Sequence, residues 1–397
     1  MSNLGDGVFL VALPLLAASI TRSPAKLSAV VFAGRLPWLL FALVSGALVD
    51  RWDRKRVMWM VDAGRFAIVG GLAWAVAADV VSIPLLVAAS FLLGVGETLF
   101  DSAAQSIVPA VVGRDSNRLE RANGRMYSAE IAANQFLGPP AGGFLFAASR
   151  AVPFLADAVS FAASSALVVG VRARSERPPR VERRSLRREI GEGVRWLWAN
   201  RLLRTLAAMT GVMNMGSMAG EAVLVLLAKE RFGLGPVGFG LLSLGGAVGS
   251  VAGSLLASRL ARHVPAGPFL LAAAASSGLS TLAIGLSTNG WMAGAAFALG
   301  GFGALAWNVV AVSLRQSIIP DRLLGRVNSV YRLLAWGTMP IGAAIGGGLA
   351  TVFGLRAAFV IPGAAMLALP VVCAPVVTTA AVNAARANSR EAISDNR

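Results

Sequence analysis

The sequence predicts an all-α membrane protein in which twelve transmembrane helices form two pseudo-symmetric six-helix bundles. The 397 residues are 56% hydrophobic and 14% charged, whereas soluble domains have about 25% charged residues. Apolar runs of about 20 residues recur along the chain, and each is long enough to cross a hydrocarbon core of about 30 Å. In addition, motifs of the first half recur in the second half, which predicts an internal repeat.

The expected spans are rich in Ala, Val, Leu, Gly and Phe, and each is bounded by charged residues or proline. They lie at residues 4–20, 27–49, 57–78, 82–104, 126–148, 152–171, 205–227, 237–258, 266–286, 291–313, 328–350 and 357–377. None alternates with a period of two, which argues against a β-barrel. Backbone polar groups inside a bilayer must be satisfied within their own segment, so we predict that the runs are helices.

The longest hydrophilic segment divides the spans six and six. The expected parts are a six-helix bundle at 1–171, a basic cytoplasmic linker at 172–204, a second six-helix bundle at 205–380 and a cytoplasmic tail at 381–397. Residues 187–204 carry Ile190, Val194, Leu197 and Trp198 at helical spacing. This pattern predicts an amphipathic helix on the inner membrane surface. The alternative is a solvated linker that joins the halves and attracts anionic lipid.

The distribution of Lys and Arg predicts the orientation. If both termini are cytoplasmic, the inner segments hold 28 Lys and Arg and the outer segments hold 6. Cytoplasmic loops carry an excess of basic residues, so we expect a multi-pass protein of a bacterial-type plasma (inner) membrane with both termini inside. In a soluble chain the net charge of +16 would suggest a nucleic-acid partner. Here the excess of Lys and Arg is concentrated in the inner loops, where it is explained by membrane topology. No nucleic-acid partner is expected.

The residue types exclude several kinds of chemistry. The only cysteine, Cys373, lies in an apolar run and the only histidine, His263, lies in an inner loop, so the chain can form neither a disulfide framework nor a zinc site. No glycine-rich stretch ends in Gly-Lys-Ser/Thr, as a phosphate-binding loop for ATP would. We therefore expect no enzyme, no catalytic residue, no metal and no cofactor. The energy for any transport would come from an ion or substrate gradient.

Three pairs of motifs occur in the same order in the two halves. Residues 105–109 read Gln-Ser-Ile-Val-Pro at the end of the fourth span, and residues 316–320 read Gln-Ser-Ile-Ile-Pro at the end of the tenth. Segment 46–51 after the second span resembles 253–259 after the eighth, and glycines with proline recur in the fifth and eleventh spans. These pairs predict two parallel repeats related by an axis along the membrane normal, as in major facilitator transporters.

The loop between the second and third spans reads Gly46-x-x-x-Asp50-Arg51-x-Asp53-Arg54-Lys55-Arg56. It resembles the signature loop of the major facilitator superfamily, which usually has glycine at the position of Asp53. The wider pattern is similar to the drug:proton antiporter branch that includes macrolide and siderophore (enterobactin-type) exporters. It consists of Gly5-Asp6, Ala12-Leu13-Pro14-Leu15, Arg35-x-Pro37, Asp62-x-x-Arg65 and Gln105-x-x-x-Pro109.

This resemblance implies a secondary active transporter. We expect proton-coupled efflux of a small amphipathic molecule of the drug, macrolide or siderophore type by alternating access. The expected partners are this small molecule, protons as the coupling ion and the lipid bilayer, and we expect the chain to be monomeric. The alternatives are an importer or facilitator with the same fold and a non-transporting receptor or assembly subunit.

Two motifs are expected to gate the transporter. The segment Gly138-Pro139-Pro140-x-Gly142-Gly143 resembles the antiporter motif of the fifth helix, where a bend would seal one side of a cavity; the alternative is ordinary tight helix packing. In the signature loop, we expect Asp50 to act as a cytoplasmic latch by meeting arginines or the N-terminal end of a helix. The second half has Ala257 at the matching position, so the latch depends on Asp50 alone. The alternative is that the basic loop only sets topology.

Ionisable groups inside spans are costly and are therefore candidates for coupling. Asp6, Arg35 and Glu221 lie deepest when depth is counted along each span. We expect Asp6 or Glu221 to carry the transported proton and Arg35 to tune it, the alternative being a fixed Asp6–Arg35 ion pair. Glu130 and Asp157 lie near the ends of their spans and are expected to be solvated.

Two further pairs of ionisable residues lie on single faces of the third and fourth spans. Asp62 and Arg65 are i,i+3 neighbours, so they are expected to neutralise each other. Glu97 and Asp101 are i,i+4 neighbours at the inner end of the fourth span. They are expected either to take part in proton coupling or to pair with the arginines of the signature loop.

Overall fold

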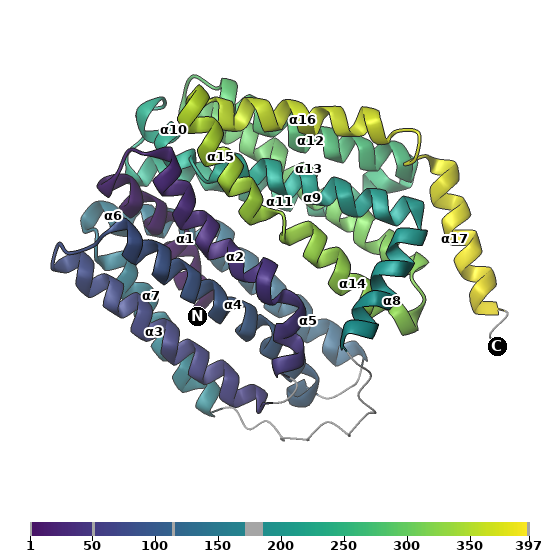
Figure 1. Ribbon diagram of the computed structural model, residues 1–397, viewed down its shortest axis with the longest axis horizontal. Coiled ribbons are helices and arrows are strands. Elements are labelled where there is room, and N and C mark those ends of the chain that lie inside the picture. The colour runs from purple at the N-terminus through teal and green to yellow at the C-terminus, as the bar shows by residue number, and fades with distance from the viewer. Residues whose placement is uncertain (1, 50–51, 113–115, 171–185, 395–397) are drawn as a thin grey trace. The chain divides into compact units, whose positions relative to one another are not determined.

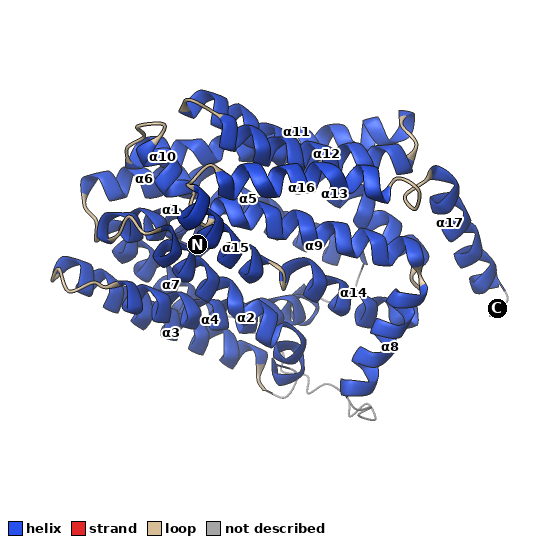
Figure 2. Ribbon diagram, turned by 45° about the horizontal axis from the view of Figure 1, so that its top comes forward, coloured by secondary structure: helices blue, strands red, loops and turns tan. Residues whose placement is uncertain are grey.

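The computed structural model describes residues 2–49, 52–112, 116–170 and 186–394. Within these ranges every regular element is helical (Figure 1, Figure 2), and the helices fall into two compact units. The first unit contains α1 (Ser2–Ile20), α2 (Pro24–Val49), α3 (Arg54–Ala77), α4 (Ile83–Val112), α5 (Ser116–Ile131), the π-helical segment η1 (Ala132–Leu137), α6 (Gly138–Ala148), α7 (Val152–Gly170), α10 (Leu224–Glu230) and the start of α11 (Pro236–His263). The second unit contains α8 (Leu186–Ala199), α9 (Arg201–Glu221), the rest of α11, α12 (Ala266–Leu286), α13 (Gly290–Ile318), α14 (Asp321–Trp336), α15 (Met339–Phe353), α16 (Ala357–Cys373) and α17 (Thr379–Ser394).

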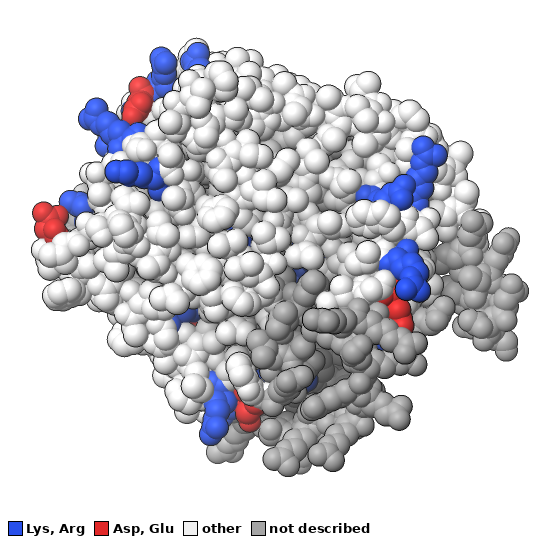
Figure 3. Space-filling model, viewed as in Figure 1, with Lys and Arg blue, Asp and Glu red and all other residues white. Residues whose placement is uncertain are grey.

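The predicted all-α membrane class is confirmed. In the described part of the chain, eight helices are long and apolar enough to cross a membrane, and α9 with α10, which meet at a bend of 41°, would make a ninth. On the face seen in Figure 3, most of the described surface belongs to uncharged residues. Each of the twelve expected spans falls on one helix or on consecutive helical segments. The count of twelve, and the division into bundles at 171 and 205, stay predictions.

Two of the expected spans are broken for reasons that proline explains. The span expected at 126–148 consists of α5, η1 and α6, because Pro139 and Pro140 have no N–H to continue the α-helical bonding. The span expected at 328–350 consists of α14 and α15, which are separated by a turn at 337–338. Pro340 stands in the first turn of α15, where a missing N–H is tolerated.

Small residues let the helices of the first unit approach closely. α1 packs on α6 and α7, α2 packs on α4, and α3 packs on α4 and α7. A Cβ atom at Gly138 of α6 would lie 2.5 Å from Gly7 Cα of α1, and one at Gly142 would lie 2.6 Å from the Val8 carbonyl oxygen. Backbones this close exclude any side chain at the crossing, which is how small residues hold membrane helices together.

The second unit has its own core. α12 packs on α13 and α16, and α9 packs on α15 and α16. On α14, the Tyr331 hydroxyl lies 2.7 Å from Thr210 Oγ1 of α9, and the Arg315 guanidinium of α13 lies 4.1 Å from the centre of the Tyr331 ring. Hydrogen bonding of a buried tyrosine hydroxyl satisfies its one polar atom, so this cluster fixes α14 against α9 and α13.

The amphipathic helix expected at 187–204 is present in part as α8, which ends at Ala199 and packs on α14 and α9, whereas residues 201–204 begin α9. Its Leu197 is 0% exposed, and Glu192 forms an ion pair with Arg326 of α14. Val194 and Trp198 remain exposed, so the predicted apolar face is split between packing and exposure. The location of α8 on a membrane surface stays a prediction. The tail expected at 381–397 begins inside α17, which packs on α12 and α13.

Candidate functional site

A cavity of about 440 Å³ lies within the first unit. This volume is in the range of small-molecule sites, about 300–1,000 Å³. Its charged lining residues are Asp6, Arg35, Arg65, Glu97, Asp101, Glu130 and Asp157. They contribute five carboxyl groups and two guanidinium groups, while Phe9, Phe100 and Phe161 are among the apolar residues beside them. The cavity is therefore apolar in part and rich in carboxyl groups.

Two buried polar atoms of the wall have no hydrogen-bond partner among the residues that the structure describes. The Ser90 hydroxyl of α4 belongs to a residue that is 4% exposed, and it is unpartnered. The Asn134 Oδ1 atom of η1 is also unpartnered. Both residues line the cavity. Because buried polar groups are normally hydrogen-bonded, these atoms favour a ligand with polar groups.

The residues predicted for coupling are partly brought together. Asp6 of α1, Arg35 of α2 and Glu97 of α4 share the cavity wall. Asp6 and Arg35 form no ion pair with each other, so the alternative of a fixed pair is not found in this structure. Glu221 does not line this cavity: it ends α9 in the second unit, and its side chain is exposed.

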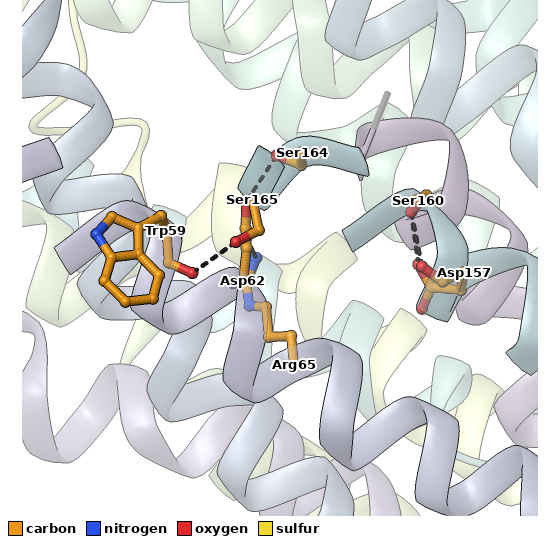
Figure 4. A network of polar contacts seen from close by, with 7 residues as sticks. All are labelled: Trp59, Asp62, Arg65, Asp157, Ser160, Ser164 and Ser165. Atoms are coloured by element: carbon orange, nitrogen blue, oxygen red, sulfur yellow. Dashed lines mark hydrogen bonds and ion pairs between the residues drawn. The ribbon is translucent and has the colours of Figure 1, made fainter. Parts of the chain in front are cut away.

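Asp62 and Arg65 form the pair that their spacing predicts (Figure 4). Arg65 Nη1 lies 3.8 Å from Asp62 Oδ1, and the Ser164 hydroxyl of α7 donates to Asp62 Oδ2 at 2.6 Å. The Arg65 guanidinium lies 5.3 Å from the ring centres of both Phe100 and Phe161. Cation–π contacts of this kind stabilise a guanidinium away from water. Asp62 is 0% exposed and lies outside the cavity lining, whereas Arg65 is part of it.

The expectation that Asp157 is solvated is wrong. Asp157 of α7 is 1% exposed, it lines the cavity, and the Ser160 hydroxyl donates to its Oδ1 atom at 3.3 Å (Figure 4). A Cβ atom at Gly5 of α1 would lie 2.2 Å from this Oδ1 atom, so the α1 backbone covers the carboxyl group. Depth counted along one helix does not reveal such a cover, because a neighbouring helix supplies it. Glu130 agrees better with expectation, since it is exposed although it lines the cavity.

The antiporter-like segment combines a π-helical interruption with a close helix contact. The Gly138 N–H donates to the Ala133 carbonyl oxygen, five residues back, which is a π-helical hydrogen bond. Pro139 and Pro140 follow at once and cannot donate. Further along, a Cβ atom at Gly143 would lie 2.6 Å from the Pro236 carbonyl oxygen at the start of α11. The motif thus interrupts the α-helical hydrogen bonding where it packs on its neighbours; the expected bend and its gating role stay predictions.

The signature loop is described in part. Asp50 and Arg51 lie outside the described residues, and Gly46 lies in α2. Asp53 is the N-cap of α3 and accepts a hydrogen bond from the Arg56 N–H at 2.9 Å. Arg54, Lys55 and Arg56 form the first turn of α3. An aspartate at an N-cap is strongly preferred, which explains why aspartate fits at position 53 even though the family usually has glycine there.

Comparison with known proteins identifies the family. A family model described as "Transmembrane secretion effector", of the major facilitator type, matches residues 1–396. The chain is 30% identical over 386 residues to multidrug efflux pump Tap of Mycolicibacterium fortuitum, covering 94% of this chain and 92% of that protein. It is 25% identical over 354 residues to enterobactin exporter EntS of Escherichia coli O1:K1 / APEC, covering 88% and 82%.

A solved structure is similar in fold. The bacterial homologue of the iron transporter ferroportin, in an inward-facing state, superposes with a TM-score of 0.70 at 17% identity, covering 93% of this chain and 96% of that chain. At this identity the likeness concerns the fold alone. Together, the helical architecture, the matched family model and the efflux relatives confirm the resemblance that the signature loop suggested. The chain belongs to the transmembrane secretion effector family of major facilitator transporters.

Proposed function

We propose that this transporter exports a small amphipathic molecule with a positive charge in exchange for protons across a bacterial plasma membrane. The observation that carries the proposal is the cavity of the first unit, in which five carboxyl groups and two guanidinium groups stand among aromatic and aliphatic side chains. An organic cation that enters such a site loses water, and carboxylates replace the lost solvation. Relatives named as a multidrug efflux pump and an enterobactin exporter support export rather than import.

Asp6 is the proposed exchange residue. It is half-buried on α1 and lines the cavity. A carboxyl group there can hold a proton or pair with a cation, and these two states exclude each other, so release of one accompanies binding of the other. Arg35 and Arg65, in the same wall, oppose the carboxylates and limit how strongly a cation is held. Glu221 remains the second candidate for proton exchange.

Gating would rest on the signature loop and the bend. We expect Asp50 to latch the cytoplasmic side and the segment from Gly138 to Gly143 to seal the cavity by close helix contact. Binding and release need no covalent chemistry, so the proposal contains no catalytic residue. The chain is expected to act as a monomer with both termini cytoplasmic.

The proposal is tested in inverted membrane vesicles with an inside-acid proton gradient. Vesicles that contain the protein should accumulate a fluorescent lipophilic cation, and a protonophore should abolish the accumulation. An anionic amphiphile of similar size should not accumulate, because carboxylates exclude it. Asp6→Asn should bind the cation but lose gradient-driven uptake. If the wild-type protein does not accumulate the cation, or accumulates the anion equally well, the proposal fails; an importer would behave in the first way.

A further inference from the structure

We propose that Asp157 of α7 is a second proton-carrying residue, neutral in the conformation described here and ionised when a cation occupies the cavity. This inference rests on the proton exchange proposed above and adds a residue that the sequence did not reveal. It predicts that two protons, one from Asp6 and one from Asp157, leave the protein for each cation bound.

Asp157 is buried and forms no ion pair among the described residues. Its exposed fraction is 1%. From the described residues its carboxyl group accepts a hydrogen bond only from the Ser160 hydroxyl, at 3.3 Å, and that hydroxyl lies closer to the Asp157 carbonyl oxygen, at 2.8 Å. An ionised carboxylate held this way would lose several kcal/mol of solvation without repayment from a charge partner. A protonated carboxyl group avoids that loss.

The helices that pack against α7 bring few charged groups to Asp157. α7 packs on α3, α1 and α6. The charged residues of these helices that share the cavity wall with it are Arg65 of α3 and Asp6 of α1, and α6 has none. Arg65 is held by Asp62 and by two aromatic rings, and it forms no ion pair with Asp157, so it acts on that carboxyl group only from a distance. The other charged groups of the cavity wall are Arg35, Glu97, Asp101 and Glu130.

Asp157 can lose its proton because it lies in the cavity wall under a cover that α1 supplies. The residue belongs to the cavity wall, and the atom that covers its Oδ1 from α1 is backbone at Gly5, directly before Asp6. A movement of α1 against α7 therefore changes the cover of Asp157 and the position of Asp6 together. When water or a cation reaches the cavity, the proton leaves the Asp157 oxygen for water, and the carboxylate that remains pairs with the cation.

An independent observation indicates that this cavity receives a ligand. The Ser90 hydroxyl belongs to a residue more than nine-tenths buried, lines the same cavity and finds no partner among the described residues. This observation does not depend on how many carboxyl groups line the cavity. A ligand that places a polar group there would satisfy the hydroxyl and would lie in a cavity that Asp6 and Asp157 also line.

The test counts protons released when a lipophilic cation is added to the purified, weakly buffered protein, followed with a pH indicator. Wild type should release two protons per cation bound, Asp157→Asn and Asp6→Asn one each, and the double variant none. The matched control is Asp79→Asn, which removes an exposed carboxyl group just after α3 that forms an ion pair with Arg150 at 3.8 Å; this variant should release two protons. If wild type releases protons and Asp157→Asn releases equally many, Asp157 is not a carrier, although the proposed function stands. If wild type releases none, the proposed function itself fails.

A second measurement does not need transport or cation binding, and the Ser160→Ala variant tests the inference without any change to the Asp157 carboxyl group. The infrared spectrum of the cation-free wild type at neutral pH should contain a protonated-carboxyl band that is missing in Asp157→Asn and kept in Asp79→Asn. Ser160→Ala keeps the Asp157 carboxyl group and removes its hydrogen-bond donor, so the same band should move. Protonated-carboxyl spectra that are identical in wild type, Asp157→Asn and Ser160→Ala would overturn the inference.

Discussion

The crossing of α1 and α6 gives a prediction that can be worked from distances. A Cβ atom at Gly138 would meet three backbone atoms, Gly7 Cα at 2.5 Å and the Ala133 oxygen and Gly7 carbonyl carbon at 2.7 Å. Backbone atoms cannot rotate away as a side chain can, so Gly138→Ala must push α6 off α1. Gly71 of α3 is the matched control, since a Cβ there meets nothing within 4 Å. Both glycines lie inside helices, so both variants gain the same helix propensity.

The difference in stability between the two variants measures the cost of disturbing the contact between α1 and α6. Overpacking of this kind costs about 1–3 kcal/mol, so Gly138→Ala should be less stable than Gly71→Ala by that amount. For a unit of roughly 200 residues this corresponds to a melting temperature lower by about 2–12 °C. The assay is thermal unfolding of the detergent-purified variants, followed by tryptophan fluorescence. Equal melting temperatures for the two variants would mean that α1 and α6 do not approach as closely as the structure has them.

Three further predictions concern the signature loop and the topology. Asp53→Ala removes the N-cap of α3 and should lower thermal stability by about 0.5–2 kcal/mol, whereas Asp53→Asn keeps a capping oxygen and should stay near wild type in the same unfolding assay. Asp50→Asn and Gly46→Leu should both slow uptake into inverted vesicles without much loss of cation affinity; wild-type rates in Asp50→Asn would indicate that the loop only sets topology. Cysteines introduced at Ser175 and Ser389 should resist a membrane-impermeant thiol reagent in intact cells. Ready labelling of both would show that the orientation is the opposite of the predicted one.

Local patterns predicted much of the fold because membrane helices are encoded locally. A run of apolar residues has to form a helix in a bilayer wherever it occurs, and the twelve expected spans therefore fall on helical segments. The Asp62–Arg65 pair could be predicted for the same reason, because i,i+3 residues share a face whatever surrounds the helix. The interruptions within spans are harder to predict. A proline indicates where a backbone hydrogen bond is lost, but it does not indicate that a π-helical turn precedes it.

The candidate site could be predicted only in part because its properties come from contacts between helices. Depth within single spans indicates Asp6 and Arg35, which line the cavity, and also Glu221, which does not. Glu97 is indicated by its i,i+4 spacing to Asp101 at the inner end of the fourth span. Asp157 was missed because its burial depends on the α1 backbone at Gly5, more than a hundred residues away in the chain. The signals available were the glycine directly before Asp6 and the Asp157-x-x-Ser160 spacing. Neither indicates which two helices meet.

The aromatic clamp on Arg65 has a consequence for how the substrate range of such a transporter can change. A flat guanidinium fits between Phe100 and Phe161, and a lysine ammonium would keep the charge but lose the stacking. Even the conservative substitution Arg65→Lys should therefore disturb this cluster. Arg35 has no ring contact among the described residues, so its replacement by lysine, glutamine or an acid would change the cavity charge without dismantling a packed cluster. Selection on a new drug should therefore recover substitutions at position 35 and leave position 65 untouched.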